Sequence, residues 1–248
     1  MTKSTKRAFL WAILLGSNLS IGWGQNSPQS PWTAYTTSSV RPEKRSKFEG
    51  YLKRWVAACR KAGVPWFHTF ETFAGDTTEY ITIMPVMRFG DLDGSSPVER
   101  VVGQAQWKHF SNATARCYTS QTRQYATPHT ESEINKTGAL SGAYWIETRT
   151  LAAPGKMNDY LIWLRDDYRP ALEKAGVRRF EVSQPVFGAV AGEIITTRML
   201  NDLADIDSGP VLSKALNDED ARAMAAKSGA LASSSSTRIL RLRSDLSY

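Results

Sequence analysis

The hydrophobic positions of this chain follow two periods, one of three to four residues and one of two. Within residues 41–60 the apolar side chains recur at spacings of three and four, between lysines and arginines: Phe48, Tyr51, Leu52, Trp55, Val56 and Cys59. This spacing predicts an amphipathic helix. We expect Gly63 to end that helix in the left-handed conformation.

Residues 156–175 show the same helical period, with apolar side chains on one face: Met157, Tyr160, Leu161, Leu164, Tyr168, Ala171 and Leu172. Pro170 is expected to kink the last turns, because proline removes a backbone hydrogen bond and clashes with the preceding turn. The segment therefore predicts a second long amphipathic helix in the other half of the chain.

Shorter apolar or alternating runs between these helices predict strands. The elements expected in the first half are a strand at 32–40, the helix at 41–60, strands at 66–73 and 80–86, a helix at 97–115 and a strand at 117–127. Those expected in the second half are a strand at 144–151, the helix at 156–175, strands at 178–187 and 192–200, a helix at 210–229 and a strand at 236–243. Both halves have the same order of elements.

A sequence repeat supports this correspondence. The tetrapeptide KAGV occurs at 61–64 and again at 174–177, an offset of 113 residues. At the same offset, further identical residues match: Trp32 with Trp145, Phe67 with Phe180, Gly75 with Gly188, Ile81 with Ile194, Pro97 with Pro210 and Val98 with Val211. The chain is therefore predicted to use one supersecondary unit twice.

The order strand, helix, strand, strand, helix, strand is the βαββαβ unit of ferredoxin-like folds, in the α+β class. One such unit leaves one sheet face bare, and a second copy in the same chain can cover it. We therefore expect two tandem ferredoxin-like units packed sheet to sheet as an intramolecular α+β barrel. The predicted boundaries are a signal peptide at 1–24, a flexible leader at 25–31, the first unit at 32–128, a linker at 129–143 and the second unit at 144–248.

This tandem arrangement resembles the dimeric α+β barrel superfamily, which includes antibiotic-biosynthesis monooxygenases, haem-degrading monooxygenases and the NIPSNAP proteins. The ending LRLRSDLSY at 240–248 is similar to that of exported bacterial proteins of unassigned function with a fused pair of such units. The resemblance implies a barrel over residues 32–248. It does not imply one activity, because the superfamily supports unrelated chemistries.

The N-terminus differs from the rest of the chain. Residues 1–7 carry three basic side chains and no acid, and the nine residues AFLWAILLG that follow are uncharged. This is typical of a secretory signal peptide, and the apolar run is too short to span a bilayer. We expect cleavage after Gly24 and a secreted or periplasmic protein without stable membrane insertion; an uncleaved membrane anchor is the alternative.

Net charge and cysteine content bear on whether the protein binds nucleic acid, binds a metal or forms a disulfide. The formal net charge is +7, and cleavage after Gly24 would lower it to +4, which does not require a nucleic-acid partner. The cysteines are Cys59 and Cys117, and their spacing matches no metal or CxxC motif. One disulfide and two buried thiols both remain open.

The usual catalytic signatures are missing: no phosphate-binding loop, HExxH, GxSxG or CxxC motif occurs. His68 lies within a predicted strand, and the repeat places Glu181 at the equivalent position. If both face the barrel lumen, they form a candidate acid–base pair or a polar ligand clamp. A structural or solvent-facing His68 is the alternative, because parity alone does not fix the face of a strand.

Other polar and aromatic residues fall on the predicted strands. A polar-tipped lumen pocket for a flat apolar or aromatic ligand would be lined by Tyr35, His68, Glu71, Tyr80, Arg149, Glu181, Gln184 and Arg198. The alternative is a lumen filled by packed aromatic and aliphatic side chains, and the sequence does not choose between them.

Two further motifs suggest a metal but have simpler explanations. His109 lies on a predicted helix, and the resemblance to haem-binding relatives makes it a candidate iron ligand, with an exposed polar residue as the alternative. The acidic pairs Asp91/Asp93 and Asp205/Asp207 precede SSP and SGP, which we interpret as helix caps with proline at the first helical position. We therefore expect no metal site and no cofactor.

Three functions remain at this point. The first is a non-enzymatic small-ligand-binding or interaction protein of the NIPSNAP-like kind, favoured because no catalytic constellation is present. The second is a cofactor-independent monooxygenase or isomerase acting on a small aromatic or polyketide-like substrate. The third is haem binding; in each case the protein could also associate as a homodimer.

Overall fold

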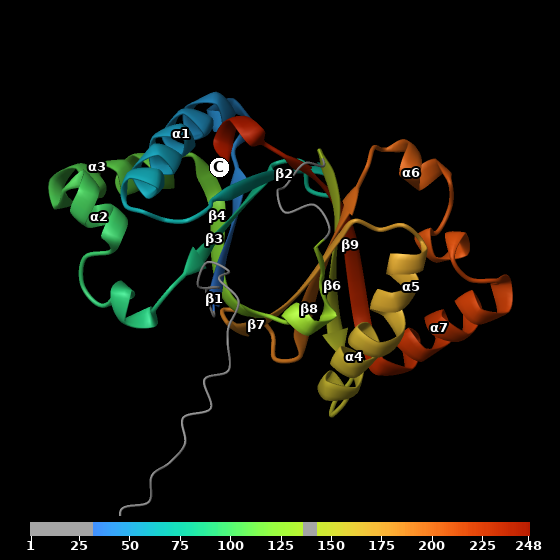
Figure 1. Cartoon of the computed structure of the whole chain (residues 1–248). Coiled ribbons are helices and arrows are strands. Elements are labelled where there is room, and N and C mark those ends of the chain that lie inside the picture. Colours follow the sequence, from blue (N-terminus) through green and yellow to red (C-terminus); the bar gives the residue numbers. More distant parts are fainter. Residues whose placement is uncertain (1–31, 136–142) are drawn as a thin grey trace, which may run out of the picture.

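The computed structural model describes residues 32–135 and 143–248. The predicted signal peptide and leader, and residues 136–142 of the predicted linker, lie outside the described residues. Within the described part, the two halves of the chain form two helical layers on either side of a shared system of strands (Figure 1).

The first half contains β1 (Trp32–Val40), α1 (Arg45–Lys61), β2 (His68–Ala74), β3 (Glu79–Val86), α2 (Pro97–Val102), α3 (Gln104–Ala115) and β4 (Tyr118–Pro128). Short 3-10 turns at Pro42–Lys44 and Phe89–Leu92 connect some of these elements. After β4, a 3-10 turn at Thr130–Ser132 and the short strand β5 (Ile134–Asn135) lie in the segment predicted as a linker.

The second half contains β6 (Tyr144–Ala152), α4 (Met157–Trp163), a π-helical turn (Leu164–Tyr168), α5 (Arg169–Lys174), β7 (Arg179–Phe187), β8 (Glu193–Leu200), α6 (Ala204–Asp207), α7 (Asp218–Leu231) and β9 (Ala232–Leu242). A 3-10 turn at Val211–Lys214 precedes α7, and another at Ser244–Leu246 follows β9. Among the described residues, no helix combines the length and the apolar character needed to cross a bilayer.

The strands form one closed antiparallel barrel. Their order is β4-β1-β3-β2-β9-β6-β8-β7, and β4 also pairs with β7. In each half the four strands have the spatial order of a ferredoxin-like sheet, in which the first strand lies between the fourth and the third. The two halves are joined by edge pairing, β2 with β9 and β4 with β7, so the barrel covers all four exposed edges. The predicted α+β fold of two tandem ferredoxin-like units is confirmed.

The strand registers refine the repeat. His68 pairs with Ile83, three residues before the end of β3, and Glu181 pairs with Thr197, three residues before the end of β8, so these two positions are equivalent. Trp32 pairs with the last residue of β3, whereas Trp145 pairs with Met199, the last but one of β8. The predicted match of Trp32 with Trp145 is therefore wrong by one residue, which places the two rings on opposite faces of the wall.

Two predicted helices differ from the structure. The helix expected at 97–115 is divided by Gly103, whose φ of 88° no helix accommodates; Ser96 caps its first part through Glu99 N, as predicted. The helix expected at 210–229 begins only at Asp218, because Asn217 accepts a hydrogen bond from Asp220 N and acts as the N-cap. Pro210 instead precedes a single 3-10 turn.

The segment at 156–175 contains a π-helical turn that ends at Tyr168, two residues before Pro170. Proline cannot donate the backbone hydrogen bond that a regular helix requires, and one wider turn accommodates this loss. The predicted irregularity is therefore present, and it widens the helix at Leu164–Tyr168 rather than simply bending it.

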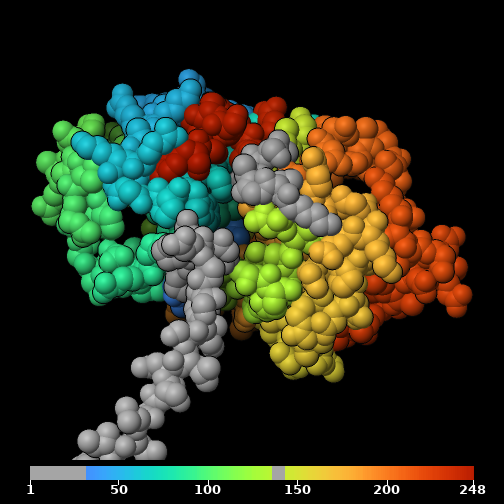
Figure 2. Space-filling view, in the orientation of Figure 1, coloured from blue at the N-terminus to red at the C-terminus, as the bar shows by residue number. Residues whose placement is uncertain are grey.

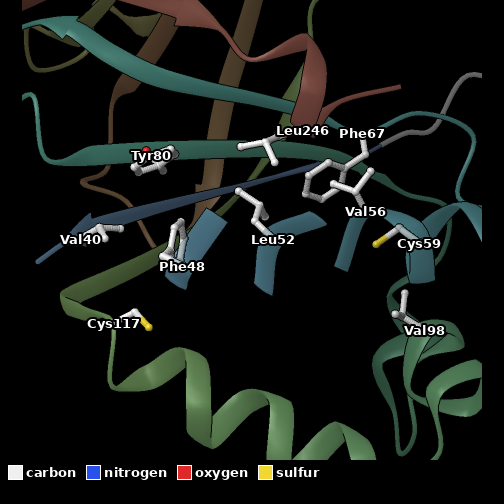
Figure 3. Packing of buried hydrophobic residues seen from close by; sticks show 10 residues of the cluster. All are labelled: Val40, Phe48, Leu52, Val56, Cys59, Phe67, Tyr80, Val98, Cys117 and Leu246. Carbon is white, nitrogen blue, oxygen red and sulfur yellow. The ribbon is translucent and has the colours of Figure 1, made fainter. Parts of the chain in front are cut away.

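The core of the first half is completed by the end of the chain. Leu246 is fully buried among Phe48, Leu52, Val56 and Phe67 (Figure 3). Phe67 and Tyr248 exchange two backbone hydrogen bonds of 3.0 and 2.8 Å. Figure 2 shows the C-terminal atoms, in red, set among the blue and cyan atoms of the first half. The last residues of the second half thus belong structurally to the first.

Cys59 and Cys117 lie in the same core but are free thiols. Figure 3 shows them at opposite ends of the cluster. Burial raises the pKa of the Cys59 thiol to about 12, so it stays protonated and unreactive at neutral pH. Of the two alternatives left open by the sequence, the structure has the buried thiols.

Candidate functional site

The middle of the barrel is filled by side chains. Residues from seven of the strands form one buried cluster: Tyr35, Phe70, Ile81, Ala126, Trp145, Met199 and Leu240. The Tyr35 hydroxyl crosses the lumen and donates a 3.0 Å hydrogen bond to Ser183 Oγ on β7. Burial raises the pKa of Tyr35 far above its usual value. Tyr35 therefore serves as a neutral, anchored part of the core.

Charged side chains occupy one end of the lumen, where β3 and β8 begin. The fully buried carboxylate of Glu147 accepts hydrogen bonds from Arg149 Nε and Arg238 Nε, both at 2.8 Å. Arg149 also donates to Glu193 Oε1 at 2.7 Å, and Arg238 to Glu79 Oε2 at 2.5 Å. These pairs compensate the buried charge of Glu147, so an ion-pair network occupies this end of the lumen.

The other end of the lumen, where β2 and β7 begin, holds His68, Arg179 and Glu181. Arg179 donates to Glu181 Oε1 at 2.7 Å, and its guanidinium lies 5.8 Å from the centre of the Trp145 ring. The imidazole of His68 stacks on Trp66 with ring centres 5.0 Å apart. Burial and then the charge of Arg179 lower the pKa of His68 to about 4, so the imidazole is neutral at physiological pH.

A further carboxyl group, that of Glu133, lies at this end of the lumen. Burial, reinforced by the nearby charge of Glu181, raises the pKa of Glu133 to about 7. Nothing in the sequence singled out Glu133, because it lies in the segment predicted as a linker. Glu133 is buried because the short strand β5, which directly follows it, pairs with β7.

The eight residues predicted to line the lumen divide between the two faces of the wall. Tyr35, His68, Arg149 and Glu181 are on the lumen side, so the structure brings His68 and Glu181 onto the same face at equivalent heights. The other four are on the helix side: Glu71, Tyr80, Gln184 and Arg198. The expectation that all eight line one pocket is therefore wrong, because strand parity assigns alternate residues to opposite faces.

The four helix-side residues have partners there. Glu71 is buried and forms ion pairs with Arg45, Arg241 and Arg243. The Tyr80 hydroxyl donates to Glu49, and Gln184 Oε1 lies 3.0 Å from His129 Nε2. Arg198 lies near the Tyr168 ring and the Asp205 carboxylate. These contacts tie strands to helices and turns.

A cavity of about 450 Å³ lies between the helices and the sheet of the second half. We call it the second-unit cavity. One wall is formed by strand hydroxyl groups, mainly Thr148, Thr150 and Thr196 with Ser233, Ser234 and Ser235. The opposite wall is aromatic and aliphatic, from Tyr160, Trp163, Leu164, Tyr168, Leu212 and Met224. Its volume lies within the range of small-molecule sites.

Local sequence explains why space remains there. The stretch of α7 that faces the sheet offers small side chains, including Ala225, Ser228 and Gly229, and in β9 four consecutive serines at 233–236 follow Ala232. The π-helical turn adds Leu164 and Tyr168 from the other side. Sequence reasoning missed this cavity because it began the last strand at 236 and the last helix at 210. The run of serines was the available signal.

Hydrogen bonding in the second-unit cavity is incomplete. The Tyr160 hydroxyl donates to Thr150 Oγ1 at 3.3 Å. Trp163 Nε1 is buried beside the cavity and has no hydrogen-bond partner among the described residues. An unsatisfied buried donor costs about 1–3 kcal/mol, so a ligand acceptor that reached it would gain stabilisation.

The lining of this cavity offers little for acid–base chemistry. Among the described residues that line it there is no histidine, carboxylate, lysine or arginine. Burial raises the pKa of the Tyr160 and Tyr168 phenols above their usual value, so both are protonated at neutral pH. The arrangement can hold and orient a neutral molecule, whereas it offers no general base.

His109 lies at a different place, a groove of about 550 Å³ between α1 and α3. We call it the α1–α3 groove. The residues present do not fit a haem: His109 is exposed at the groove, and the Trp55 and Trp107 rings lie 5.0 Å apart in mutual contact, leaving no slot between them for a macrocycle. The described residues also contain no group of three or more His, Cys, Asp or Glu side chains that could hold a metal ion.

The predicted acidic caps have local roles. Asp205 Oδ2 accepts hydrogen bonds from Asn201 N at 2.8 Å and Asn201 Nδ2 at 3.0 Å, and Lys214 lies 3.5 Å from its other oxygen. These bonds lower the pKa of Asp205 and close the turn before α6. The acidic side chain therefore stabilises a loop.

No protein-family model and no curated protein matches the chain in sequence. Solved structures do match in fold. A "putative monooxygenase" from Lactobacillus acidophilus NCFM is similar with a TM-score of 0.60 and 7% identity, over 86% of this chain and 94% of that one. An "anthrone oxidase-like protein" is similar with a TM-score of 0.62 and 14% identity, over 87% and 92%.

A third structure, a "putative monooxygenase" from Fusobacterium nucleatum, has a TM-score of 0.58 and 9% identity, over 87% of this chain and 94% of that one. At such low identity these likenesses show the fold alone. The fold is that of the dimeric α+β barrel proteins, here completed within one chain.

Proposed function

We propose that this protein is an exported, non-enzymatic binding protein of the NIPSNAP-like α+β barrel kind, which holds a small neutral ligand in the second-unit cavity. The carrying observation is the divided lining of that cavity, with hydroxyl groups on the strand wall and aromatic rings on the helix wall. A ligand with one flat apolar face and one edge of hydroxyl or carbonyl groups complements both walls.

The filled lumen supports this choice of site. The apolar cluster around Trp145 fills the middle of the lumen, and the ion pairs of Glu147 occupy one end of it. His68 and Glu181 share the lumen face, but Glu181 is bound to Arg179, which leaves it poorly placed to take a proton from a ligand. A role of these residues as a ligand clamp remains a prediction.

The test is a screen of small neutral aromatic compounds by NMR, followed through the tryptophan indole N–H signals of the protein. We expect hits to shift the Trp163 signal, and we expect the Trp163→Phe variant to bind them about tenfold more weakly if it loses one hydrogen bond. Trp55→Phe, in the α1–α3 groove, is the matched control and should bind normally. Hits that never affect Trp163 and are insensitive to its substitution would exclude this cavity.

The alternative is a cofactor-independent monooxygenase or isomerase on a small aromatic or polyketide-like substrate. It is supported by the names of the structures with the same fold and by the Tyr160 phenol in the cavity. Anthrone and O2 would then be converted to anthraquinone and water, with one O2 consumed per anthrone, faster than without the protein, and Tyr160→Phe would slow this conversion. Binding without conversion would favour the non-enzymatic function.

Export and assembly are separate proposals. We propose cleavage after Gly24, so the N-terminal sequence of the protein from the periplasm or medium should begin at Gln25; a retained Met1 would contradict it. Association into a homodimer is a further proposal, and light scattering of the purified protein gives the molar mass that decides it.

A further inference from the structure

The α1–α3 groove lies on the outside of the first half, away from the barrel wall. Its lining comes entirely from helices: Tyr51, Arg54, Trp55 and Ala58 from α1, Val102 from α2, and Ala105, Gln106, Trp107, His109 and Phe110 from α3. Among the described residues, no strand contributes to it. It is therefore separate from the second-unit cavity and differs from it in chemistry.

Three rings of the groove are in mutual contact, with Phe110 nearly parallel to both indoles and the two indoles inclined to each other by 36°. Trp55 and Phe110 are inclined by 19°, Trp107 and Phe110 by 20°, with ring centres 6.0 and 5.9 Å apart. Tyr51 meets Phe110 edge-on at 85°. The result is a contiguous but not flat aromatic wall, and a flat ring system can pack against its outer side.

The polar groups of the groove are basic or neutral. Arg54 is exposed and forms no ion pair or hydrogen bond within the described residues, and His109 is also exposed. Gln106 adds an amide, and no aspartate or glutamate is among the described residues of the lining. An uncompensated guanidinium beside an aromatic wall favours an anionic group on the ligand.

The helix that carries most of the wall can adjust to a ligand. None of the residues of α3 is buried, and the helix follows Gly103, whose φ of 88° breaks the connection to α2. Contacts of Trp107 and Phe110 with α1 hold α3 in place. Few other contacts oppose a small shift of α3 over a bound molecule.

We propose that the α1–α3 groove is a second binding site, for a planar aromatic carboxylate or sulfonate whose ring lies on the Trp55–Trp107–Phe110 wall and whose anionic group pairs with Arg54. This site does not depend on the function proposed for the second-unit cavity.

The test uses 2-naphthoate as the probe, with 2-naphthamide as its neutral analogue and cyclohexanecarboxylate as its non-aromatic analogue. Calorimetry should give saturable 2-naphthoate binding that shifts the indole N–H signals of Trp55 and Trp107, with 2-naphthamide weaker and cyclohexanecarboxylate without effect. Arg54→Gln should weaken 2-naphthoate by about three- to fivefold, as expected for an exposed ion pair, and leave 2-naphthamide unchanged.

Trp107→Ala should weaken both aromatic probes by about tenfold through the lost ring contact. Arg54→Gln changes only an exposed side chain, so it remains informative if Trp107→Ala perturbs the helices. Trp163→Phe, in the other cavity, should bind 2-naphthoate normally. The absence of saturable binding at millimolar 2-naphthoate, or equal binding by the wild type and both groove variants, would overturn the proposal.

Discussion

At the scale of single residues, two groups at the end of the lumen near His68 have pKa values shifted in opposite directions. The pKa of His68 is lowered to about 4 by burial and by Arg179, while that of Glu133 is raised to about 7 by burial and by Glu181. The charged groups that act on this end of the lumen are thus Arg179 and Glu181, together with Glu131 near Glu133. Each shift has a measurable consequence.

The first consequence concerns the imidazole itself. We expect the NMR signal of His68 to titrate with a midpoint near pH 4, and Arg179→Gln to raise that midpoint because it removes a repelling positive charge. Loss of the signal in His68→Gln assigns the resonance. A wild-type midpoint near the ordinary histidine value of about 6.5 would contradict the burial of this side chain.

The second consequence concerns stability against pH. Between pH 4 and 6.5 the unfolded chain binds a proton at His68 that the folded protein does not, so this residue makes stability rise with pH. Between pH 4.5 and 7 the folded protein holds a proton on Glu133 that the unfolded chain has released, so that residue makes stability fall.

Urea denaturation at several pH values separates the two effects. In His68→Gln, the increase of stability with pH that His68 causes should be absent. Its stability should therefore decline from pH 4.5 to 7 relative to the wild type. Glu133→Gln should lose the decline and serves as the opposite control. Identical pH dependence in all three proteins would show that neither group is displaced as described.

At the scale of elements, closure of the barrel depends on one turn. Gly188, directly after β7, has a φ of 76°, and a Cβ placed there would lie 2.2 Å from the Arg123 carbonyl oxygen of β4. Only glycine allows the two strands to approach this closely. Gly176 has a similar φ of 81°, but a Cβ placed there would have no other atom within 4 Å.

These two glycines form a matched pair for mutation. Gly176→Ala should cost about 1–2 kcal/mol of unfolding free energy, the strain of the left-handed conformation alone. Gly188→Ala adds the overlap with β4 and should cost about 3 kcal/mol or more. Denaturant unfolding measures both, and equal losses would indicate that the β4–β7 contact is not tight.

The C-terminal turn gives a second prediction at this scale. Leu246→Ala removes a fully buried side chain from the core of the first half and should cost about 2–5 kcal/mol. Leu92→Ala is the control, since Leu92 is 41% exposed and its loss should change stability by less than about 0.5 kcal/mol. A small effect at Leu246 would mean that the end of the chain is only loosely attached.

At the scale of the whole molecule, neither half is complete alone. Residues 32–135 without the rest would expose the edges of β2 and β4 and lose Leu246 from their core. We expect this fragment to aggregate or to remain without cooperative unfolding in circular dichroism. Addition of residues 143–248 should restore a soluble complex, whereas a cooperatively folded monomer of the fragment alone would contradict the interdependence.

The sequence predicted this architecture well because the repeat and the strand and helix periods gave the same answer. The repeat also placed His68 and Glu181 at equivalent positions, which the registers confirm. It could not choose the face of each strand, so Glu71 and Tyr80 were assigned to the lumen although they contact α1 residues. A difference of one residue in register decides such assignments.

The second-unit cavity could not be predicted for a different physical reason. A cavity is the space that side chains leave, and it depends here on the small residues of α7, on the π-helical turn and on where β9 begins. Pro210 favoured an early helix start, while Asn217 provides the actual cap. Pro210 and Asn217 are both plausible helix starts in the sequence, and only the structure shows that the helix begins after Asn217.

The position of Leu246 also sets an order of events. The first half lacks part of its core and one strand neighbour until β9 and the turn after it are present. A chain that folds as it leaves the ribosome therefore cannot complete its first half before Leu246 has emerged. A chain truncated before residue 246 leaves the first half incomplete and therefore open to proteolysis.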